Sequence, residues 1–229
     1  MKLSDLARIN AARSQRQKVV TLTNLATGEQ SVLIGQDAFE YELSALESMP
    51  QIGGSPDNPS REHSSFVNVY QPNRRIVVIG AVHITQALAA MAQIAEFDVV
   101  VVDPRTAFAT PERFRGVNVV AEWPEDAFRT LSLDEFTALV ALSHDPKIDD
   151  FAIATALRQE CFYVGALGSR KTHAKRLERL AAQGVAASDL ARIRGPVGVD
   201  IGAKSPSEIA VAILADLINA WRQPSRALA

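Results

Sequence analysis

Five short runs of consecutive apolar residues, rich in β-branched side chains, recur along the later two thirds of this 229-residue chain. The runs are "IVVIG" (76–80), "DVVVVD" (98–103), "VNVV" (117–120), "ALVALS" (138–143) and "CFYVGA" (161–166). Strands that are apolar on consecutive residues are buried on both faces, which is typical of a parallel sheet covered by helices. Helix-like patterns separate several of the runs, at about residues 84–96, 147–159, 170–182 and 206–222. This alternation predicts an α/β fold with a doubly wound, mostly parallel sheet.

The first part of the chain has a different pattern. Residues 19–35 read as two short strands around a Thr-Gly turn, and residues 38–49 as a helix. Residues 50–65 are dense in Pro, Gly, Ser and Asn, which is typical of a flexible linker. We therefore predict that residues 1–65 form a small N-terminal appendage that contains a β-hairpin and the flexible linker.

The remaining residues, 66–229, are predicted to form one Rossmann-like domain. It opens on the alternating stretch "FVNVYQP" (66–72), which predicts a strand. Its last helix has a clear start signal, because Ser205 at the N-cap, Pro206 at the first helical position and Glu208 at the third make a capping box.

Composition excludes several classes of protein. The formal net charge of −2 provides no basic field for nucleic-acid binding. No apolar run approaches the roughly 20 residues that span a membrane, and the N-terminus has an early Asp5 and no apolar segment of the kind found in secretory signals. The single cysteine, Cys161, excludes an internal disulfide and a multi-cysteine zinc site, and we interpret it as a small core residue. We expect a cytoplasmic protein with no nucleic-acid or membrane partner.

Ligands of a doubly wound sheet bind outside the carboxyl ends of its strands, so the loops that follow the predicted strands are the candidate binding site. The candidate residues are small or polar and lie in these loops or just before the capped helix. They are Gly80, Ala81, His83, Asp103, Arg105, His144, Asp145, Gly165, Gly168, Ser169, Arg170, Asp200, Gly202 and Lys204. We expect them to gather at one edge of the sheet.

Gly80 begins an incomplete dinucleotide fingerprint. The fingerprint places glycine at the third and sixth positions, where this chain has Val82 and Thr85. A branched side chain at Val82 obstructs the approach of a pyrophosphate, and Thr85 adds bulk where helix packs on strand. Asp103 lies where a ribose-binding acid usually stands. Gly80 is equally consistent with a plain turn between strand and helix.

The stretch "GALGSRKTHAKR" (165–176) places four cations in the first turns of a predicted helix, at Arg170, Lys171, Lys175 and Arg176. Cations there oppose the helix dipole. One interpretation is a solvated basic face. The other is an anion held by the glycines, Ser169 and the N-terminal amides, which would turn the penalty into an attraction.

The stretch "GVDIGAKSPSEIA" (198–210) combines tight glycine backbone with a cation, Lys204, before a helix N-terminus. Asp200 can face a ring donor of a ligand or form a local salt bridge with Lys204. Two histidines and two aspartates of the other loops can also converge to form a metal site or an acid–base pair. They are His83, His144, Asp103 and Asp145. No ligand spacing along the sequence supports a metal, so we predict neither a metal site nor a catalytic residue.

Taken together, five segments resemble the C-terminal Rossmann-like domain of the XdhC/CoxI family, the accessory proteins of xanthine dehydrogenase and related molybdenum hydroxylases. The resemblance covers about residues 66–223. The segments are "IVVIGAVHITQAL", "VVVVDPRTAFATPERF", "ALSHDPKIDD", "YVGALGSRKTHAKRLERL" and "GPVGVDIGAKSPSEIAVAILADLI". The resemblance places the family's glycine turn on Gly80, Ala81 and His83. It places the family's GSR turn on Gly165, Gly168, Ser169 and Arg170. It places the family's DIGA motif on Asp200, Ile201, Gly202 and Ala203.

The resemblance implies a maturation protein that binds molybdenum cofactor (molybdopterin) as cargo, assists its sulfuration or insertion, and meets a molybdenum hydroxylase apo-enzyme. It implies a cofactor chaperone more than an enzyme. Val82 departs from the family's Gly-Ala-Gly-His turn, and residues 1–65 are too short for the family's cysteine-containing N-terminal domain. Two alternatives follow: a separate protein that carries that domain is a partner, or the chain is a self-sufficient, reduced form. A homodimer is compatible with the sequence.

Two other functions remain open from the residues alone. One is an NAD(P)- or flavin-dependent oxidoreductase, which needs Asp103 on a ribose and a glycine turn around the pyrophosphate. The other is a Rossmann-like scaffold that binds no ligand, against which the cationic helix start and the Lys204 turn both count.

Overall fold

The computed structural model of the chain describes residues 2–41 and 65–223. The chain divides into two compact units, Met1–Pro72 and Asn73–Ala229, which are described separately below. No helix in the described part of the chain is long and apolar enough to cross a bilayer.

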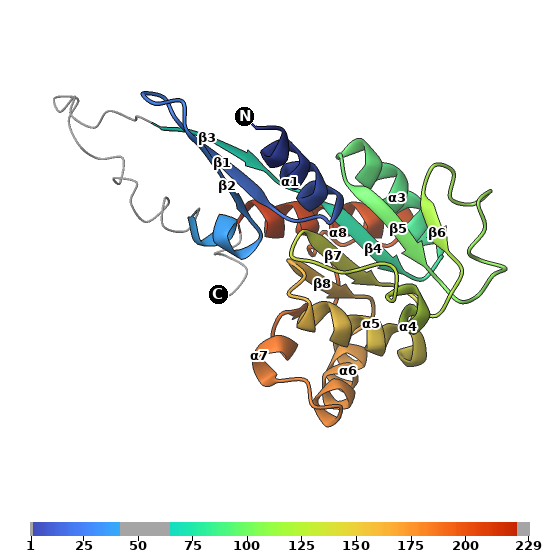
Figure 1. The fold of residues 1–229 in the computed structure, drawn as a ribbon. Helices are drawn as coiled ribbons and strands as arrows, with labels where there is room; N and C mark the ends of the chain where they lie inside the picture. The colour runs from blue at the N-terminus through green and yellow to red at the C-terminus, as the bar shows by residue number, and fades with distance from the viewer. Residues whose placement is uncertain (1, 42–64, 224–229) are drawn as a thin grey trace, which may run out of the picture. The chain divides into compact units, whose positions relative to one another are not determined.

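The N-terminal unit is a three-stranded antiparallel sheet with one helix packed on it (Figure 1). Helix α1 (Leu3–Ser14) precedes strands β1 (Val19–Asn24) and β2 (Gln30–Ile34), which form the predicted hairpin. Strand β3 (Ser65–Tyr70) pairs with the other side of β1, so the strand order is β2-β1-β3.

The strand predicted at 66–72 forms, but it belongs to this N-terminal sheet and not to the Rossmann-like domain. Its residue Phe66 pairs with Thr23 of β1, and the boundary between the two units falls after Pro72. An alternating pattern indicates a strand without naming its partner, which explains the difference. Residues 36–41 are helical, as expected for the helix predicted at 38–49. The rest of the predicted helix and nearly all of the predicted 50–65 linker lie outside the described residues.

The second unit contains a six-stranded parallel sheet, which confirms the doubly wound Rossmann-like fold. The five predicted strands all form. The sixth, β9, was missed because it is two residues long, and Cys161 precedes β8 and does not begin it. The order β6-β5-β4-β7-β8-β9 is the Rossmann order 3-2-1-4-5-6. The strands are β4 (Arg75–Ile79), β5 (Asp98–Val102), β6 (Asn118–Val120), β7 (Thr137–Ala141), β8 (Tyr163–Ala166) and β9 (Ile193–Arg194).

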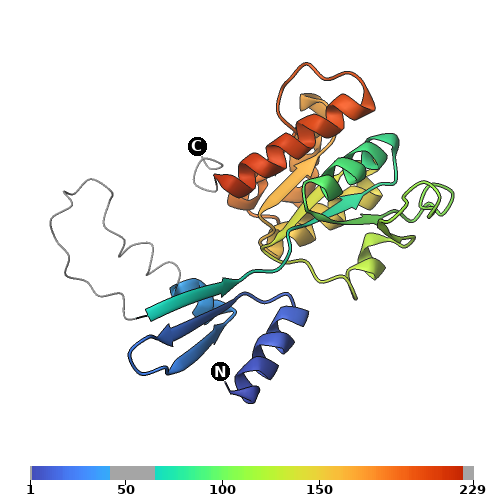
Figure 2. The same cartoon turned by 90° about the horizontal axis from the view of Figure 1, so that it is seen from above.

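Helices cover both faces of this sheet (Figures 1 and 2). Helices α3 (His83–Ile94) and α8 (Pro206–Arg222) pack side by side on one face. The other face is covered by α4 (Pro124–Ala127), α5 (Pro146–Arg158) and α6 (Arg170–Ala182), with the short α7 (Ala187–Leu190) beside them. Consecutive residues of β4 therefore face two separate apolar layers, which is why this strand is apolar throughout.

The predicted capping box of α8 is confirmed. The Ser205 hydroxyl accepts a hydrogen bond from the Glu208 N–H at 3.3 Å, and the Glu208 carboxylate accepts from the Ser205 N–H at 2.8 Å. The same carboxylate also accepts from the Lys204 N–H at 2.8 Å. The capping box therefore anchors the end of the preceding loop to the helix.

Candidate functional site

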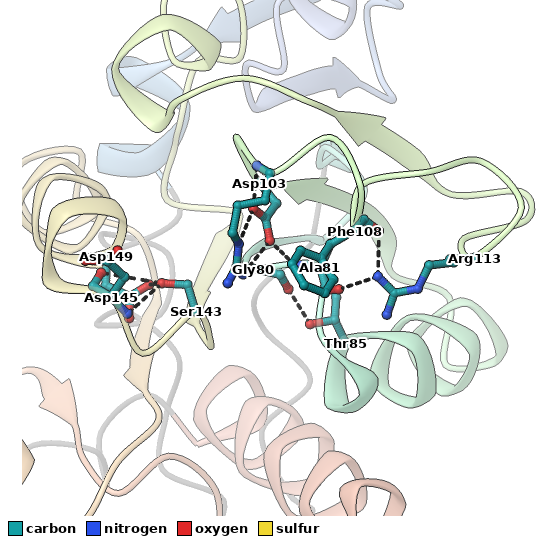
Figure 3. Close-up of polar contacts among 10 residues, drawn as sticks. Gly80, Ala81, Thr85, Asp103, Phe108, Arg113, Ser143, Asp145 and Asp149 are labelled. Atoms are coloured by element: carbon teal, nitrogen blue, oxygen red, sulfur yellow. Dashed lines mark hydrogen bonds and ion pairs between the residues drawn. The ribbon is translucent and has the colours of Figure 1, made fainter.

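The sheet reverses its winding direction between β4 and β7, and their carboxyl ends lie level. Ile79 of β4 pairs with Val102 of β5 on one side and with Ala141 of β7 on the other. Ligands of open α/β sheets bind at such a switch point. Most of the predicted site residues follow these strands or β8, as expected, and Figure 3 shows the loops that surround Gly80.

Gly80 is explained by the packing of the chain against itself. Its φ is +109°, and a Cβ at this position would lie 2.8 Å from the backbone nitrogen of Ser143. The fully buried Thr85 donates a hydrogen bond from its hydroxyl to the Gly80 carbonyl at 2.5 Å. Thr85, one of the two residues that depart from the dinucleotide fingerprint, thus holds the turn closed.

Asp103 is fully buried and binds the chain's own donors (Figure 3). Its Oδ2 accepts from the Ala81 N–H at 2.7 Å, and Arg105 donates from Nη2 to Oδ2 at 2.7 Å and from Nε to Oδ1 at 2.9 Å. Burial raises the pKa of this carboxyl, but the hydrogen bonds from Arg105 and Ala81 outweigh it, so the pKa of Asp103 is lowered. Both oxygens are engaged, which argues against a role on a ribose.

The loop after β5 contributes a residue that the sequence analysis missed. Arg113 donates to the carbonyl of Ala81 at 3.0 Å and to that of Phe108 at 2.7 Å. The Phe108 ring lies 4.9 Å from the guanidinium carbon of Arg105 and 5.7 Å from that of Arg113. Arg113 comes ten residues after Asp103, so its place along the sequence carried no signal of the turn it binds.

The loop after β7 is also tied down from inside. The Ser143 hydroxyl donates to Oδ1 of Asp149 at 2.7 Å and accepts from the Asp145 N–H at 3.0 Å. Asp145 caps α5, since its Oδ1 accepts from the Lys147 N–H at 2.9 Å. His144 is exposed in the left-handed region at φ +66°. Neither Ser143 nor Asp149 is among the site residues predicted from the sequence.

The two histidines and two aspartates of these loops do not assemble a reactive centre. His83 and His144 are exposed, Asp103 pairs with Arg105, and Asp145 serves as a cap. Within residues 2–41 and 65–223, no three His, Cys, Asp or Glu side chains gather closely enough to hold a metal ion. Cys161 is fully buried, and burial raises the pKa of its thiol to about 12, which fits a core residue.

Asp149 gives the fold a specific pH dependence. Burial raises its pKa to about 6 against the opposing effects of the Ser143 hydrogen bond and the Arg176 charge. The folded state therefore holds a proton that the unfolded state has lost, and the free energy of unfolding falls as pH rises from about 4 to about 6. Between pH 5 and pH 7 we expect wild type to lose about 1 kcal/mol of stability through this group.

Urea unfolding of wild type and Asp149→Asn at pH 5 and pH 7 checks this expectation. The difference between the two proteins isolates the contribution of Asp149 from the contributions of all other groups. We expect the pH 5 to pH 7 loss to be about 1 kcal/mol smaller in Asp149→Asn. An identical loss in both proteins would contradict the buried, protonatable Asp149.

A pocket of about 330 Å³ lies where the two stretches 165–176 and 198–210 meet. Arg170 and Leu167 line it from the β8–α6 side, and Asp200 lines it from the loop before α8. The other lining residues are mostly apolar, and they are Pro196, Val197, Gly198, Val199, Ile201, Ala203, Ile209 and Ala212. The two loops are separated by about thirty residues of sequence, so the fold brings them together.

The polar groups predicted around this pocket divide into structural and available ones. Ser169 caps α6, because its hydroxyl accepts from the Thr172 N–H at 3.2 Å. A Cβ at Gly165 would lie 2.6 Å from Val197, so this glycine serves packing inside β8. Lys204 is exposed and lies outside the pocket lining, and Asp200 accepts from the Gly202 N–H at 3.3 Å and makes no salt bridge with Lys204.

The four cations at the start of α6 also fall into two groups, exposed ones and ones at the pocket. Lys171 and Lys175 are exposed, as a solvated face requires. Arg176 is only 3% exposed and donates from Nη2 to the carbonyl of Leu167 at 3.0 Å. It therefore supports the pocket wall from behind, while Arg170 lines the pocket itself.

Comparison with known proteins gives a consistent result. Residues 76–217 match a family model described as the XdhC Rossmann domain. The chain is 32% identical over 160 residues to the uncharacterized protein YqeB of Escherichia coli K12, covering 68% of this chain and 29% of that one. It is 30% identical over 155 residues to a probable xanthine dehydrogenase subunit of Bacillus subtilis 168, covering 67% of this chain and 45% of that one.

A third relative, the molybdenum cofactor insertion chaperone PaoD of Escherichia coli K12, is 32% identical over 93 residues, covering 41% of this chain and 29% of PaoD. The chain thus spans less than half the length of these curated relatives. The crystal structure of a xanthine dehydrogenase from Bacillus halodurans shares the fold, with a TM-score of 0.65 and 23% identity over 99% of this chain and 66% of that one.

Proposed function

Because this chain belongs to the family of XdhC Rossmann domains, we propose that it assists the maturation of a molybdenum hydroxylase such as xanthine dehydrogenase. In this proposal the chain binds molybdenum cofactor as cargo and supports its sulfuration or its insertion into the apo-enzyme. Two relatives support the direction of the proposal, since one is named a molybdenum cofactor insertion chaperone and the other is named as part of a probable xanthine dehydrogenase.

The observation that carries the proposal is the pocket between the two loops. A binding site for a small organic ligand is concave, mostly apolar and equipped with a few convergent polar groups. This pocket has apolar walls, the guanidinium of Arg170 and the carboxylate of Asp200. Arg170 can bind a phosphate with two parallel hydrogen bonds, which matches the phosphate of the cofactor.

The site is better suited to holding cargo than to a chemical reaction. The polar groups at the switch point are engaged by one another, as Asp103 is by Arg105 and Asp145 by the α5 backbone. The pocket groups Arg170 and Asp200 are exposed, so a ligand remains reachable for a partner. A chaperone must also release its cargo, and a site with few charge-assisted contacts permits that.

The partners follow from the same proposal. In this proposal the molybdenum hydroxylase apo-enzyme receives the cofactor, and a separate protein that carries the family's N-terminal domain is a second candidate partner. The NAD(P)- or flavin-dependent alternative draws less support, because the acid it needs, Asp103, is buried and paired.

Arg170→Ala is expected to lower the amount of cofactor retained by about tenfold, since a charge-assisted phosphate contact contributes about 1.5–3 kcal/mol. The protein is purified from a host that makes molybdenum cofactor, and molybdenum and pterin are measured per chain. Lys171→Ala is the matched control, because Lys171 is exposed on the same helix but lies outside the pocket lining. If wild type neither retains cofactor nor melts at a higher temperature with saturating cofactor, the proposed function is wrong.

A further inference from the structure

The loop that precedes α8 and lines the pocket, residues 198–205, is held at both ends by hydrogen bonds. The Val199 N–H donates to the carbonyl of Ala212 in α8 at 3.2 Å, and a Cβ at Gly198 would lie 2.9 Å from the Ile213 nitrogen, so no side chain fits there. At the other end the Glu208 carboxylate holds the N–H groups of Lys204 and Ser205. Residues 200–203, three of which line the pocket, therefore lie between two fixed points, and a site fixed before binding loses less free energy on ordering.

The polar groups of this pocket specify complementary ligand chemistry. A carboxylate only accepts hydrogen bonds and a guanidinium only donates them. One oxygen of Asp200 accepts from the Gly202 N–H, and Oδ2 accepts no hydrogen bond from the described residues. Arg170 forms no ion pair with Asp200 or with any other described residue. A ligand that satisfies both must present hydrogen-bond donors, N–H or O–H, to Asp200 and an anion to Arg170.

The pocket walls specify the shape. Val199 and Ile201 line the pocket and are 37% and 53% exposed, so their side chains present apolar surface that a ligand can cover. Leu167 and Ile209 face the same pocket from other elements. At about 330 Å³ the pocket is at the small end of the range for ligand sites, so it suits one fused ring system and leaves a longer ligand projecting outward.

We propose that this pocket selects the pterin ring of the cofactor through Asp200, a deepening that rests on the proposed function. A pterin presents its 2-amino group and an adjacent ring N–H as a pair of donors on one edge, which a carboxylate accepts side by side. The ring faces lie against Val199 and Ile201, and the phosphate reaches Arg170. Asp200 is therefore a specificity-determining residue, and Arg170 contributes affinity without reading the ring.

A fluorescence titration of the full chain with pterin-6-carboxylate and lumazine-6-carboxylate tests this assignment. Lumazine carries an oxygen in place of the 2-amino group and a hydrogen on N1, and it keeps the fused ring system and the 6-carboxylate. We expect wild type to bind the pterin about tenfold more tightly than the lumazine, a difference of about 1.4 kcal/mol. Asp200→Asn is expected to abolish that preference, and Arg170→Ala to weaken both probes equally. Glu178→Gln, which removes one exposed acid outside the pocket, is expected to change neither.

The outcomes separate this inference from the proposed function. Equal affinity of wild type for the two probes, an unchanged preference in Asp200→Asn, or no saturable pterin binding up to millimolar concentration would each overturn the role of Asp200. In all three cases retention of cofactor by wild type still supports the maturation function. Asparagine keeps an oxygen for the Gly202 N–H, so a folded Asp200→Asn variant is expected, and its thermal melt confirms that.

Discussion

Gly80→Ala is expected to lower the free energy of unfolding of the second unit by about 3 kcal/mol, from a combination of backbone strain and overpacking. The new Cβ would lie 2.8 Å from the Ser143 nitrogen, 2.9 Å from its Cα and 3.1 Å from the Leu142 carbonyl carbon. These are backbone atoms at the end of a central strand and cannot swing away as a flexible side chain does. The φ of +109° adds strain for any residue with a side chain.

Gly184→Ala is the matched control, because Gly184 also has a positive φ, +88°, but nothing within 4 Å of its Cβ position. We expect it to cost about 1 kcal/mol through backbone strain alone. Urea unfolding followed by tryptophan fluorescence reports on this unit, since Trp123 and Trp221 both lie in it. Equal losses in the two variants would show that the approach of β4 and β7 is not what requires glycine at position 80.

Most of the second unit could be predicted from the sequence because its strands are buried on both faces of the sheet. Val77 and Val78 are both fully buried although they point to opposite faces of the sheet, because helices cover each face. A run of consecutive apolar residues is the direct trace of that arrangement. Strand β9 left no such trace, since only Ile193 of its two residues is buried.

The sequence could not predict which strand pairs with which, or which groups hydrogen-bond to a given side chain. The alternation at 66–72 gave the existence of β3 but not its pairing with β1, which depends on residues more than forty positions away. The strand-end rule placed Gly80 and Asp103 at the correct edge. It did not indicate that Arg105 and the Ala81 N–H would saturate the carboxylate, because that depends on how the β5 loop folds back.

The pocket was predictable in its parts and not as a whole. The two stretches that line it, 165–176 and 198–210, were both predicted to bind a ligand. The first was chosen for its cations and the second for its glycines and Lys204. The sequence did not show that Arg170 and Asp200 would line one cavity, or that Arg176 would turn inward beneath it. Charge patterns along a helix do not distinguish an outward from an inward cation when the opposing loop is unknown.

Asp103→Ala is expected to lower the free energy of unfolding by about 3 kcal/mol, because it leaves the buried Ala81 N–H without an acceptor and removes the partner of Arg105. The Arg105 side chain is 37% exposed and can turn to water, so we expect a loss at the lower end of the range for breaking a buried ion pair. Asp98→Ala is the matched control, since Asp98 stands exposed at the opposite end of the same strand and is expected to cost less than about 0.5 kcal/mol.

The same variant decides between a structural and a nucleotide-binding Asp103. A structural carboxylate predicts that the ligand-free variant unfolds at lower urea and that millimolar NAD(P) leaves the melting temperature of wild type unchanged. A ribose-binding carboxylate predicts the reverse, namely a ligand-free variant as stable as wild type and an NAD(P)-dependent stabilisation that the substitution removes. The hydrogen bonds from Ala81 and Arg105 lead us to expect the first pattern. The second pattern would restore the oxidoreductase alternative and return Gly80 to the role of a nucleotide turn.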